Sequence, residues 1–571
     1  MGHSNSSELK KKSTKLIEYI FAEKSVSEYQ EIIYSNSDEK GVSDYFSVFY
    51  TISDTKRQAK VFRGTGTSLQ EALDKALEVA CAGVNKAEID PKWVKLEIVI
   101  DREECNPQKL VDEIFGGYSY YFRKGISLDD KYNYAYTEGE LNGFKLLDYD
   151  KKLLDLRTFN SYTMQRDDDV ILSTPKKIYS FVTDQYFCDD RGEVYKLYNE
   201  GLDTGRRIEP AVTKKEALKL VQNGVRFLIH QMHPDGTFDY GYYPLRHKLI
   251  SGYNIMRHTS SIWSLICAAE ITKDKDIYSH AVMAIKYMLS QIRYYDDGMA
   301  YLIEKDTNEI KLGANGVAII LLTQFMKLFG TDEYVSVCEK LGHGILKMMN
   351  PETGGYIHVL NADDRSLKAE YRTVYYDGEA TFALCRLYSL TGSKLWLAVA
   401  TRAVDHFIEA DYTKYRDHWV AYAVNELTMH KPEEKYFEFG LRNVMVNLET
   451  IYKQKTTYHT YLEMLMASYG IYRRIIDGGY EVKYLEEFDA DRFVETIMHR
   501  ADHMRNGYGY PELIMYYKKP SYFKGSFFVR HDAFRTRIDD VQHNCGSYIA
   551  LYHHFDELAE YIEVNHSQSE T

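Results

Sequence analysis

From residue 213 onward the chain alternates between two kinds of helical stretch, and this alternation limits the possible folds more than any other feature. The stretch "TDEYVSVCEKLGHGILKMM" places its apolar side chains on one stripe with a charged back, the pattern of a helix with one face in water. The stretch "GANGVAIILLTQF" is apolar without a break from Val317 to Leu322, which predicts a helix surrounded by protein on all sides. Together they predict an outer and an inner layer of helices.

The junctions between these helices repeat. "LIHQMHPDGTFDYGY", "LSQIRYYDDGMAYLI" and "LKMMNPETGGYIHVL" each end a helix, turn at an acidic, glycine-rich loop and leave as an aromatic extended stretch. Short connections make antiparallel hairpins, and six such hairpins can close into a ring with the apolar helices inside. We expect outer helices near 213–231, 274–293, 331–349, 394–410, 433–452 and 486–505, and inner helices that start near 257, 314, 377, 416, 458 and 539.

Residues 211–571, with repeats such as "YDGEATFALCRLYSLTGSKLWLAVATRAVDHFI", resemble the six-hairpin (α/α)6 toroids. That superfamily includes glycoside hydrolases, N-acylglucosamine-type epimerases and polysaccharide lyases. The resemblance implies a toroid that acts on a carbohydrate, but no family-specific catalytic signature accompanies it. The site therefore has to be argued from its own residues.

Residues 1–210 have a different texture. "DYFSVFYTIS", "RQAKVFRGTG" and "KWVKLEIVID" predict strands, and "SLQEALDKALEVACAG" predicts a helix, which together favour a small α/β or α+β domain. The order strand, Arg-Gly turn, helix, strand resembles AMMECR1-like domains. We expect two domains, 1–210 and 211–571, with the first dozen residues and the tail frayed.

Composition excludes several classes of function. The net charge is -13 without a basic stripe, which argues against nucleic acid as a partner. No run approaches the ~18 apolar residues of a membrane span, so we expect a soluble, cytoplasmic protein. The seven cysteines show no CxxC, and Cys545 before His553 and His554 lacks a second cysteine for a zinc site. We expect neither a metal nor a cofactor.

Every predicted inner helix begins with polar, mostly ionisable residues although its body is apolar. Asp and Asn are also preferred helix caps, but capping does not require Arg, His and Tyr at the same level. In a closed ring these starts surround one end of the central cavity, so we expect a site there. The candidate catalytic acids are Asp377, Glu379 and Asp540. The candidate substrate-binding residues are Arg257, His258, Asn315, Tyr376, Arg416, His418, Trp419, His459 and His543.

Three hypotheses follow for the function. Two carboxylates across a cavity can divide acid and base work, so the leading one is a glycoside hydrolase acting on an oligo- or polysaccharide, which can be anionic. A uronate or aminosugar epimerase, or a polysaccharide lyase, would use Tyr or His as base, with Arg257 holding an acid group. A binding protein would hold a glycan or peptide without turning it over. The sequence leaves the choice and the oligomeric state open.

Overall fold

The computed structural model describes residues 2–22, 24–38, 45–115, 121–147, 154–166 and 169–569. Its N-terminal part is a seven-stranded antiparallel sheet in the order β2-β1-β3-β6-β4-β5, with β7 paired to β6. Of the two predicted classes this is α+β. The strands are β1 (Phe46–Ser53), β2 (Lys60–Gly66), β3 (Trp93–Cys105), β4 (Gly125–Ser127), β5 (Ala135–Tyr136), β6 (Ile178–Cys188) and β7 (Val194–Leu197).

Helices cover this sheet. They are α1 (Gly2–Phe21), α2 (Val26–Asp38), α3 (Leu69–Lys86), α4 (Pro107–Phe115), α5 (Glu138–Gly143) and α6 (Leu156–Gln165). The Ser68 side chain caps α3 by accepting a hydrogen bond from the Glu71 amide. A Cβ at Gly64 would lie 2.1 Å from the Ala76 nitrogen, so only glycine lets α3 lie this close to β2. The expected frayed start is wrong, because α1 is helical and buries Leu9 and Leu16 in the same cluster as α3 and β1.

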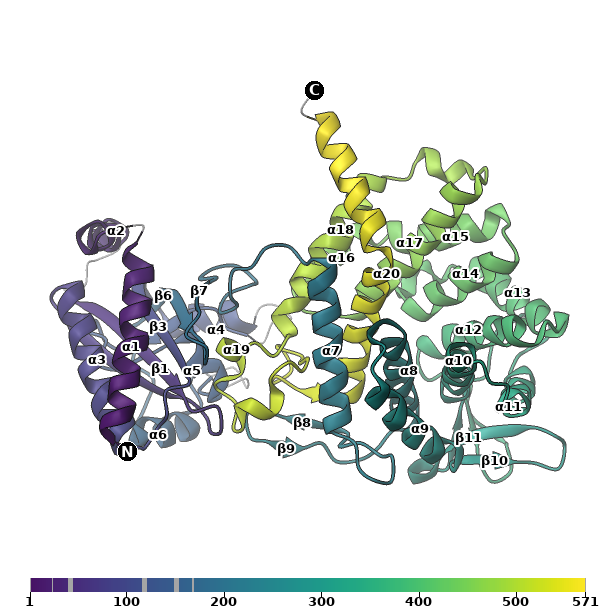
Figure 1. The fold of residues 1–571 in the computed structure, drawn as a ribbon, viewed down its shortest axis with the longest axis horizontal. Helices are drawn as coiled ribbons and strands as arrows, with labels where there is room; N and C mark the ends of the chain where they lie inside the picture. The colour runs from purple at the N-terminus through teal and green to yellow at the C-terminus, as the bar shows by residue number, and fades with distance from the viewer. Residues whose placement is uncertain are drawn as a thin grey trace.

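Twelve helices of the C-terminal part alternate between two layers, as predicted (Figure 1). The inner helices begin within two residues of the expected positions. The outer helices are α7 (Lys214–His230), α9 (Lys275–Leu289), α11 (Val335–Lys347), α13 (Lys394–Glu409), α15 (Glu434–Met445) and α18 (Ala490–His503). The inner helices are α8 (Ile255–Thr272), α10 (Leu312–Phe329), α12 (Tyr375–Thr391), α14 (His418–His430), α17 (Thr460–Gly478) and α20 (Ile538–Ser569), and the short α16 (Leu448–Tyr452) follows α15.

The inner helices close into a ring. Each packs against the next in the order α8, α10, α12, α14, α17, α20, and α20 packs back against α8. This is the (α/α)6 toroid. By length and composition α10 would also pass for a membrane span, but 83% of its 18-residue window is buried inside the fold, as its place in the inner ring requires.

Short strands connect outer to inner helices. They are β8 (Gly241–Tyr243), β9 (Lys248–Leu249), β10 (Ile292–Tyr294), β11 (Ala300–Glu304), β12 (Glu309–Lys311), β13 (Val359–Asn361), β14 (Leu367–Ala369) and β15 (Thr536–Arg537). They form two small antiparallel sheets, β10-β11-β12-β13-β14 and β15-β8-β9. The aromatic extended stretches of the repeat are therefore strands, and they lead into the inner helices.

A long connection between α18 and α20, residues 504–537, joins the two parts of the molecule. It contains α19 (Pro511–Ile514) and packs against the N-terminal sheet. The Ala59 amide donates to the Met515 carbonyl at 2.9 Å, and the Ser521 amide donates to the Thr55 carbonyl at 2.8 Å. Residue 210 lies between β7 and α7, and the division into two domains there stays a prediction.

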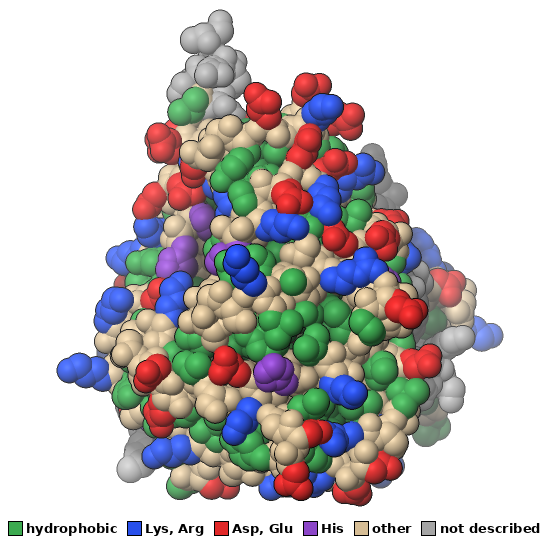
Figure 2. All heavy atoms as spheres, turned by 90° about the vertical axis from the view of Figure 1, so that its right-hand side faces the viewer, with side chains coloured by type: hydrophobic (Ala, Val, Ile, Leu, Met, Phe, Trp, Pro, Cys, Tyr) green, Lys and Arg blue, Asp and Glu red, His purple; other side chains and the backbone are tan. Residues whose placement is uncertain are grey.

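Figure 2 views the molecule from the side of the toroid that lies on the right in Figure 1. Acidic and basic side chains are interspersed over this face.

Candidate active site

A cavity of about 260 Å³ lies where the inner helices begin. Side chains from α8, α12, α14, α17 and α20 line it, together with the segment 529–537 that leads into α20. Predicted site residues that line it are Arg257, Glu379, His418, Trp419, His459, Asp540 and His543. The ring thus brings together residues that are almost 300 positions apart in the chain.

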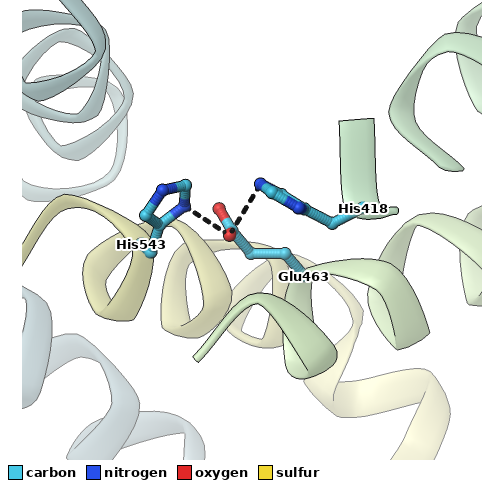
Figure 3. Close-up of side chains that lie close together, drawn as sticks. All are labelled: His418, Glu463 and His543. Carbon is cyan, nitrogen blue, oxygen red and sulfur yellow. Dashed lines mark hydrogen bonds and ion pairs between the residues drawn. The ribbon is translucent and has the colours of Figure 1, made fainter. Parts of the chain in front are cut away.

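Two cavity-lining histidines face one buried carboxylate (Figure 3). His543 Nδ1 donates to Glu463 Oε2 at 2.7 Å, and His418 Nε2 lies 3.7 Å from the same oxygen. The other oxygen of Glu463 accepts from the Tyr422 hydroxyl at 3.1 Å. His418, Glu463 and His543 come from α14, α17 and α20, so three neighbouring inner helices build this group.

The pKa values of the two histidines are shifted in opposite directions. Burial, followed by the charges of His543 and His459, lowers the pKa of His418 well below its usual value. Burial alone would lower the pKa of His543 as well, but the charge and hydrogen bond of Glu463 raise it. At neutral pH one imidazole is therefore a free base and the other holds its proton more firmly than an ordinary histidine.

The same three residues offer ligand atoms that lie within 4.8 Å of one another, as a divalent metal would need. Glu463 Oε2 and His543 Nδ1 are already joined by a hydrogen bond, and a metal would have to displace that proton. The arrangement fits a histidine, His543, that carries a proton and is oriented by the carboxylate of Glu463. The absence of a metal stays a prediction.

Glu379 is a buried acid of a different kind. Burial, reinforced by the nearby Asp417 and Asp377, raises the pKa of Glu379 well above its usual value, although Arg257 opposes the shift. Its Oε2 has no hydrogen-bond partner among the residues that the structure describes. A Cβ at Gly313 would lie 1.8 Å from this oxygen, so the glycine in "LGANG" leaves the space that the carboxyl group occupies.

Asp539 and Asp540 are held by arginines. Arg257 Nε donates to Asp539 Oδ2 at 2.7 Å, and Arg535 bonds both oxygens of Asp540 at 3.0 and 3.2 Å. Burial alone would raise the pKa of Asp540, but His459, Arg535 and Arg537 together lower it. Asp540 is therefore a permanent anion that organises the cavity wall, poorly suited to give up a proton.

Aromatic side chains form another part of the wall. Trp419 packs against Trp263 with ring centroids 5.7 Å apart, and the hydroxyls of Tyr375 and Tyr458 are 3.0 Å apart. Trp419, Tyr375 and Tyr458 line the cavity, where flat apolar faces beside polar groups suit a sugar ring.

The structure places the other predicted site residues outside the cavity lining. Asp377 is not a cap, since it accepts hydrogen bonds from His358 Nε2 at 2.8 Å and the Tyr412 hydroxyl at 2.7 Å. Tyr376 is buried with its ring beside His358. Asp377 and Tyr376 thus fasten the start of α12 to the loops around it.

Three more predicted residues have partners of their own or face solvent. His258 bonds the Tyr253 hydroxyl and the Ala284 carbonyl, and burial lowers its pKa to about 4. Asn315 accepts from the Leu302 amide and donates to the Lys311 carbonyl, which joins α10 to β11. Arg416 is exposed just before α14.

The sequence places Glu463 among the polar residues at the inner-helix starts, but we did not predict it as a catalytic or substrate-binding residue, and we predicted no role for the segment 529–537. Glu463 carries a weak signal, as the acid four positions after His459 at an inner-helix start. His531, Asp532, Arg535 and Arg537 line the cavity, and all lie in the charge-rich "RHDAFRTR" that precedes the last inner helix. The many charged residues in this segment, which show no helical periodicity, were the sequence signal that could have indicated a role in the site.

Comparison with protein-family models gives no match, and comparison with curated proteins gives none. Among solved structures, a D-mannose isomerase is similar over 60% of this chain and 99% of its own, with 11% identity and a TM-score of 0.48. Cellobiose 2-epimerase from Bacillus thermoamylovorans matches 58% of this chain and 98% of its own at 11% identity and a TM-score of 0.45. A GH76 α-mannanase from Bacteroides thetaiotaomicron matches 60% and 97% at 10% identity and a TM-score of 0.42. At such low identities and scores the reaction has to follow from the site residues themselves.

Proposed function

We propose that this protein is a sugar epimerase or isomerase that moves a proton at a carbon next to a carbonyl group. The observation that carries the proposal is the pair of cavity-lining histidines with opposite pKa shifts around one buried carboxylate. Such a pair supplies a base and an acid at the same pH, which proton transfer at carbon requires.

In the proposed reaction His418 acts as the base. Its imidazole is neutral at physiological pH, and neither ring nitrogen has a hydrogen-bond partner within the described part of the chain. It would take the proton from C2 of an open-chain aldose, and the C–H electrons would form the double bond of an enediol. No oxidant or cofactor is needed, because the carbonyl oxygen accepts the displaced electrons.

His543 acts as the acid. Its Nδ1 donates to Glu463, so Nε2 is the nitrogen left for the substrate. A proton delivered to C2 on the opposite face gives the epimer, and a proton delivered to C1 gives the ketose. Glu463 orients the imidazole and stabilises its charged form without touching the reacting carbon.

Hydrolysis remains a second candidate because of Glu379, a buried acid with raised pKa on the cavity wall. A glycosidase needs a second, available carboxylate. The other carboxylates that line the cavity, Asp532, Asp539 and Asp540, are each paired with an arginine, which leaves Glu379 without a suitable partner among the described cavity residues. Proton transfer by the histidines therefore ranks above the hydrolase hypothesis.

The test is incubation of the full chain in D2O with reducing mono- and disaccharides, including aminosugars and uronates, followed by NMR of C2 and mass analysis. An epimerase or isomerase incorporates deuterium at C2 or C1. His543→Gln and His418→Gln should each lower the rate by at least ~10²-fold, whereas His280→Gln on the outer helix α9 should not.

Unchanged deuterium incorporation in both cavity variants would rule out this assignment of the acid and the base. Products that gain water, without exchange at C2, would favour hydrolysis by Glu379 instead. In that case Glu379→Gln should abolish the activity and His418→Gln should not.

A further inference from the structure

The carbonyl oxygen of the substrate gains negative charge in the proposed reaction, because the electrons of the C–H bond at C2 move onto it. An oxygen of this kind is stabilised by a hydrogen-bond donor that is already in place before the reaction. His418 and His543 are assigned to proton transfer at carbon. The carbonyl oxygen therefore needs a donor of its own.

Glu379 lines the same cavity as the two histidines but comes from another inner helix. It lies near the start of α12, and a Cβ on the preceding Gly378 would meet the backbone of Trp419 and Val420 in α14. The close contact of α12 with α14 thus brings Glu379 and His418 to one wall of the cavity.

The two carboxyl oxygens of Glu379 have different surroundings. Oε2 occupies the space beside Gly313 and has almost no accessible surface. Oε1 makes no hydrogen bond within the described residues either, but it is not among the enclosed atoms. Glu379 is only 2% exposed and lines the cavity, so Oε1 is the atom that it presents there. An open, unpaired oxygen in a cavity wall is suited to bind a ligand.

This oxygen belongs to a carboxyl group that keeps its proton at neutral pH. Burial is the main cause that raises the pKa of Glu379 well above its usual value, and the charges of Asp417 and Asp377 add to it against Arg257. A neutral carboxyl group has one O–H to donate, whereas a carboxylate only accepts. Since Oε2 has no acceptor beside it among the described residues, a donated proton has to come from Oε1.

We propose, on the basis of the proposed function, that Glu379 is a third catalytic residue whose Oε1–H donates a hydrogen bond to the carbonyl oxygen of the open-chain sugar. This hydrogen bond strengthens as the oxygen becomes negative, so it stabilises the enediolate more than the bound sugar. In epimerisation the electrons return to C2 when His543 supplies its proton there. Glu379 keeps its own proton throughout, and no bond of Glu379 forms or breaks.

The first experiment compares Glu379→Leu with Glu379→Gln in deuterium exchange at C2. Leu cannot donate a hydrogen bond, so kcat should fall by at least ~10²-fold with little change in KM. Gln has nearly the same shape, and its amide N–H can donate to the same oxygen, so kcat should stay within about tenfold of the unmodified protein. Glu438→Leu, on the exposed side of α15, is the matched control and should keep full activity.

Equal losses of kcat in the two variants would show that Glu379 transfers a proton instead of donating a hydrogen bond. Full activity in Glu379→Leu would show that the carboxyl group does not contact the reacting sugar. Either result overturns the proposal. Thermal unfolding of both variants separates these results from a loss of folding, because removing a buried acid without a partner should not lower the Tm.

The second experiment requires no turnover. The infrared difference spectrum between the unmodified full chain and Glu379→Gln at pH 7 should contain the C=O stretch of a neutral carboxyl group. This band should shift when D-arabinonohydroxamate, an unreactive mimic of a hexose enediolate, is added. A carboxylate band at pH 7, or a neutral band that the hydroxamate leaves unchanged, overturns the proposal.

The two experiments also separate this proposal from the proposed function. If the unmodified protein exchanges no deuterium at C2, the assignment as an epimerase or isomerase fails. A neutral carboxyl band that shifts with the hydroxamate would still support Glu379 as a hydrogen-bond donor in the cavity. Rapid exchange together with full activity in Glu379→Leu would retain the proposed function and remove the role of Glu379.

Discussion

Glu463 connects the two histidines, so a single substitution there tests the acid half of the proposed reaction. Glu463→Gln keeps the shape of the side chain but removes the charge that raises the pKa of His543. We expect kcat to fall by at least ~10²-fold with little change in KM, because the acid is lost and the sugar contacts remain. Steady-state kinetics of C2 exchange measures this. Glu438→Gln, on the exposed side of α15 beside Arg442, is the matched control.

The pH profile gives an independent reading of the same pair. Activity should not fall as the pH drops through 6.5, the ordinary His value, because burial lowers the pKa of His418 and keeps it a free base. Activity should fall at alkaline pH, above 6.5, as His543 with its raised pKa loses its proton. In Glu463→Gln the alkaline limb should move to lower pH. If the alkaline limb does not move in this variant, the loss of activity at alkaline pH is not caused by deprotonation of His543.

His258 makes a prediction about stability rather than activity. The pKa of His258 is about 4 in the folded protein against 6.5 for an ordinary histidine, so below pH 6.5 the unfolded chain binds a proton that the folded protein does not. Stability should therefore be lost as the pH falls through this window, by ~3 kcal/mol from this residue. Chemical denaturation at pH 7 and pH 4 should show a smaller loss in His258→Gln than in the unmodified protein. An equal loss in both would show that other groups control the acid sensitivity.

The backbones of α12 and α14 approach each other closely near the site. A Cβ at Gly378 would lie 2.4 Å from the Val420 nitrogen and 2.6 Å from the Trp419 carbonyl carbon. Because these are backbone atoms, Gly378→Ala should push the two helices apart and destabilise the protein by about 1–3 kcal/mol in denaturant unfolding.

The matched control is Gly470→Ala on α17, where the atoms nearest to the added Cβ belong to the Asn425 side chain, at 3.1 Å or more. That change should be near neutral, since the gain in helix propensity offsets a contact that can adjust. Equal losses of stability in the two variants would show that the close approach of α12 and α14 does not determine the effect of Gly378→Ala.

The helices could be predicted because the buried face of a helix gives a periodic pattern of apolar residues in the sequence. The apolar run from Val317 to Leu322 and the stripe through Leu341 and Ile345 follow directly from the inner and outer layers. The segment 504–537 has no such period, because it is fixed by contacts with a sheet hundreds of residues away. For the same reason, Asp377 and Glu379 could not be distinguished: only the fold decides that one meets His358 and the other the cavity.

At the scale of the whole molecule, a buried ionic contact joins the segment after β7 to α19 of the long connection. Arg207 bonds both oxygens of Glu512 at 2.7 Å, and both side chains are almost fully buried. We expect Arg207→Met to cost about 3–5 kcal/mol, because it leaves a carboxylate buried without its partner. Denaturant unfolding measures this, with Arg226→Met as the exposed control.

The same contacts predict cooperative unfolding of the full chain. Hydrophobic residues of both parts, such as Phe49 of β1 and Leu513 of α19, belong to one buried cluster. Calorimetry should therefore show one transition, and residues 211–571 expressed alone should be less stable than the full chain. Two well-separated transitions would show instead that the parts unfold independently.

The closure of the ring by α20 also sets an order of events during synthesis. Arg257 and Asp539, whose side chains meet at 2.7 Å, are separated by 282 positions in the chain. The ribosome therefore synthesises the first helices around the cavity long before the last one, and the pair of His418 and His543 can form only after α20 has been made. Until then the apolar bodies of α8 and α17 lack the inner helix that packs between them in the closed ring. The interval between the first and the sixth hairpin is when a nascent chain of this kind most needs protection from aggregation.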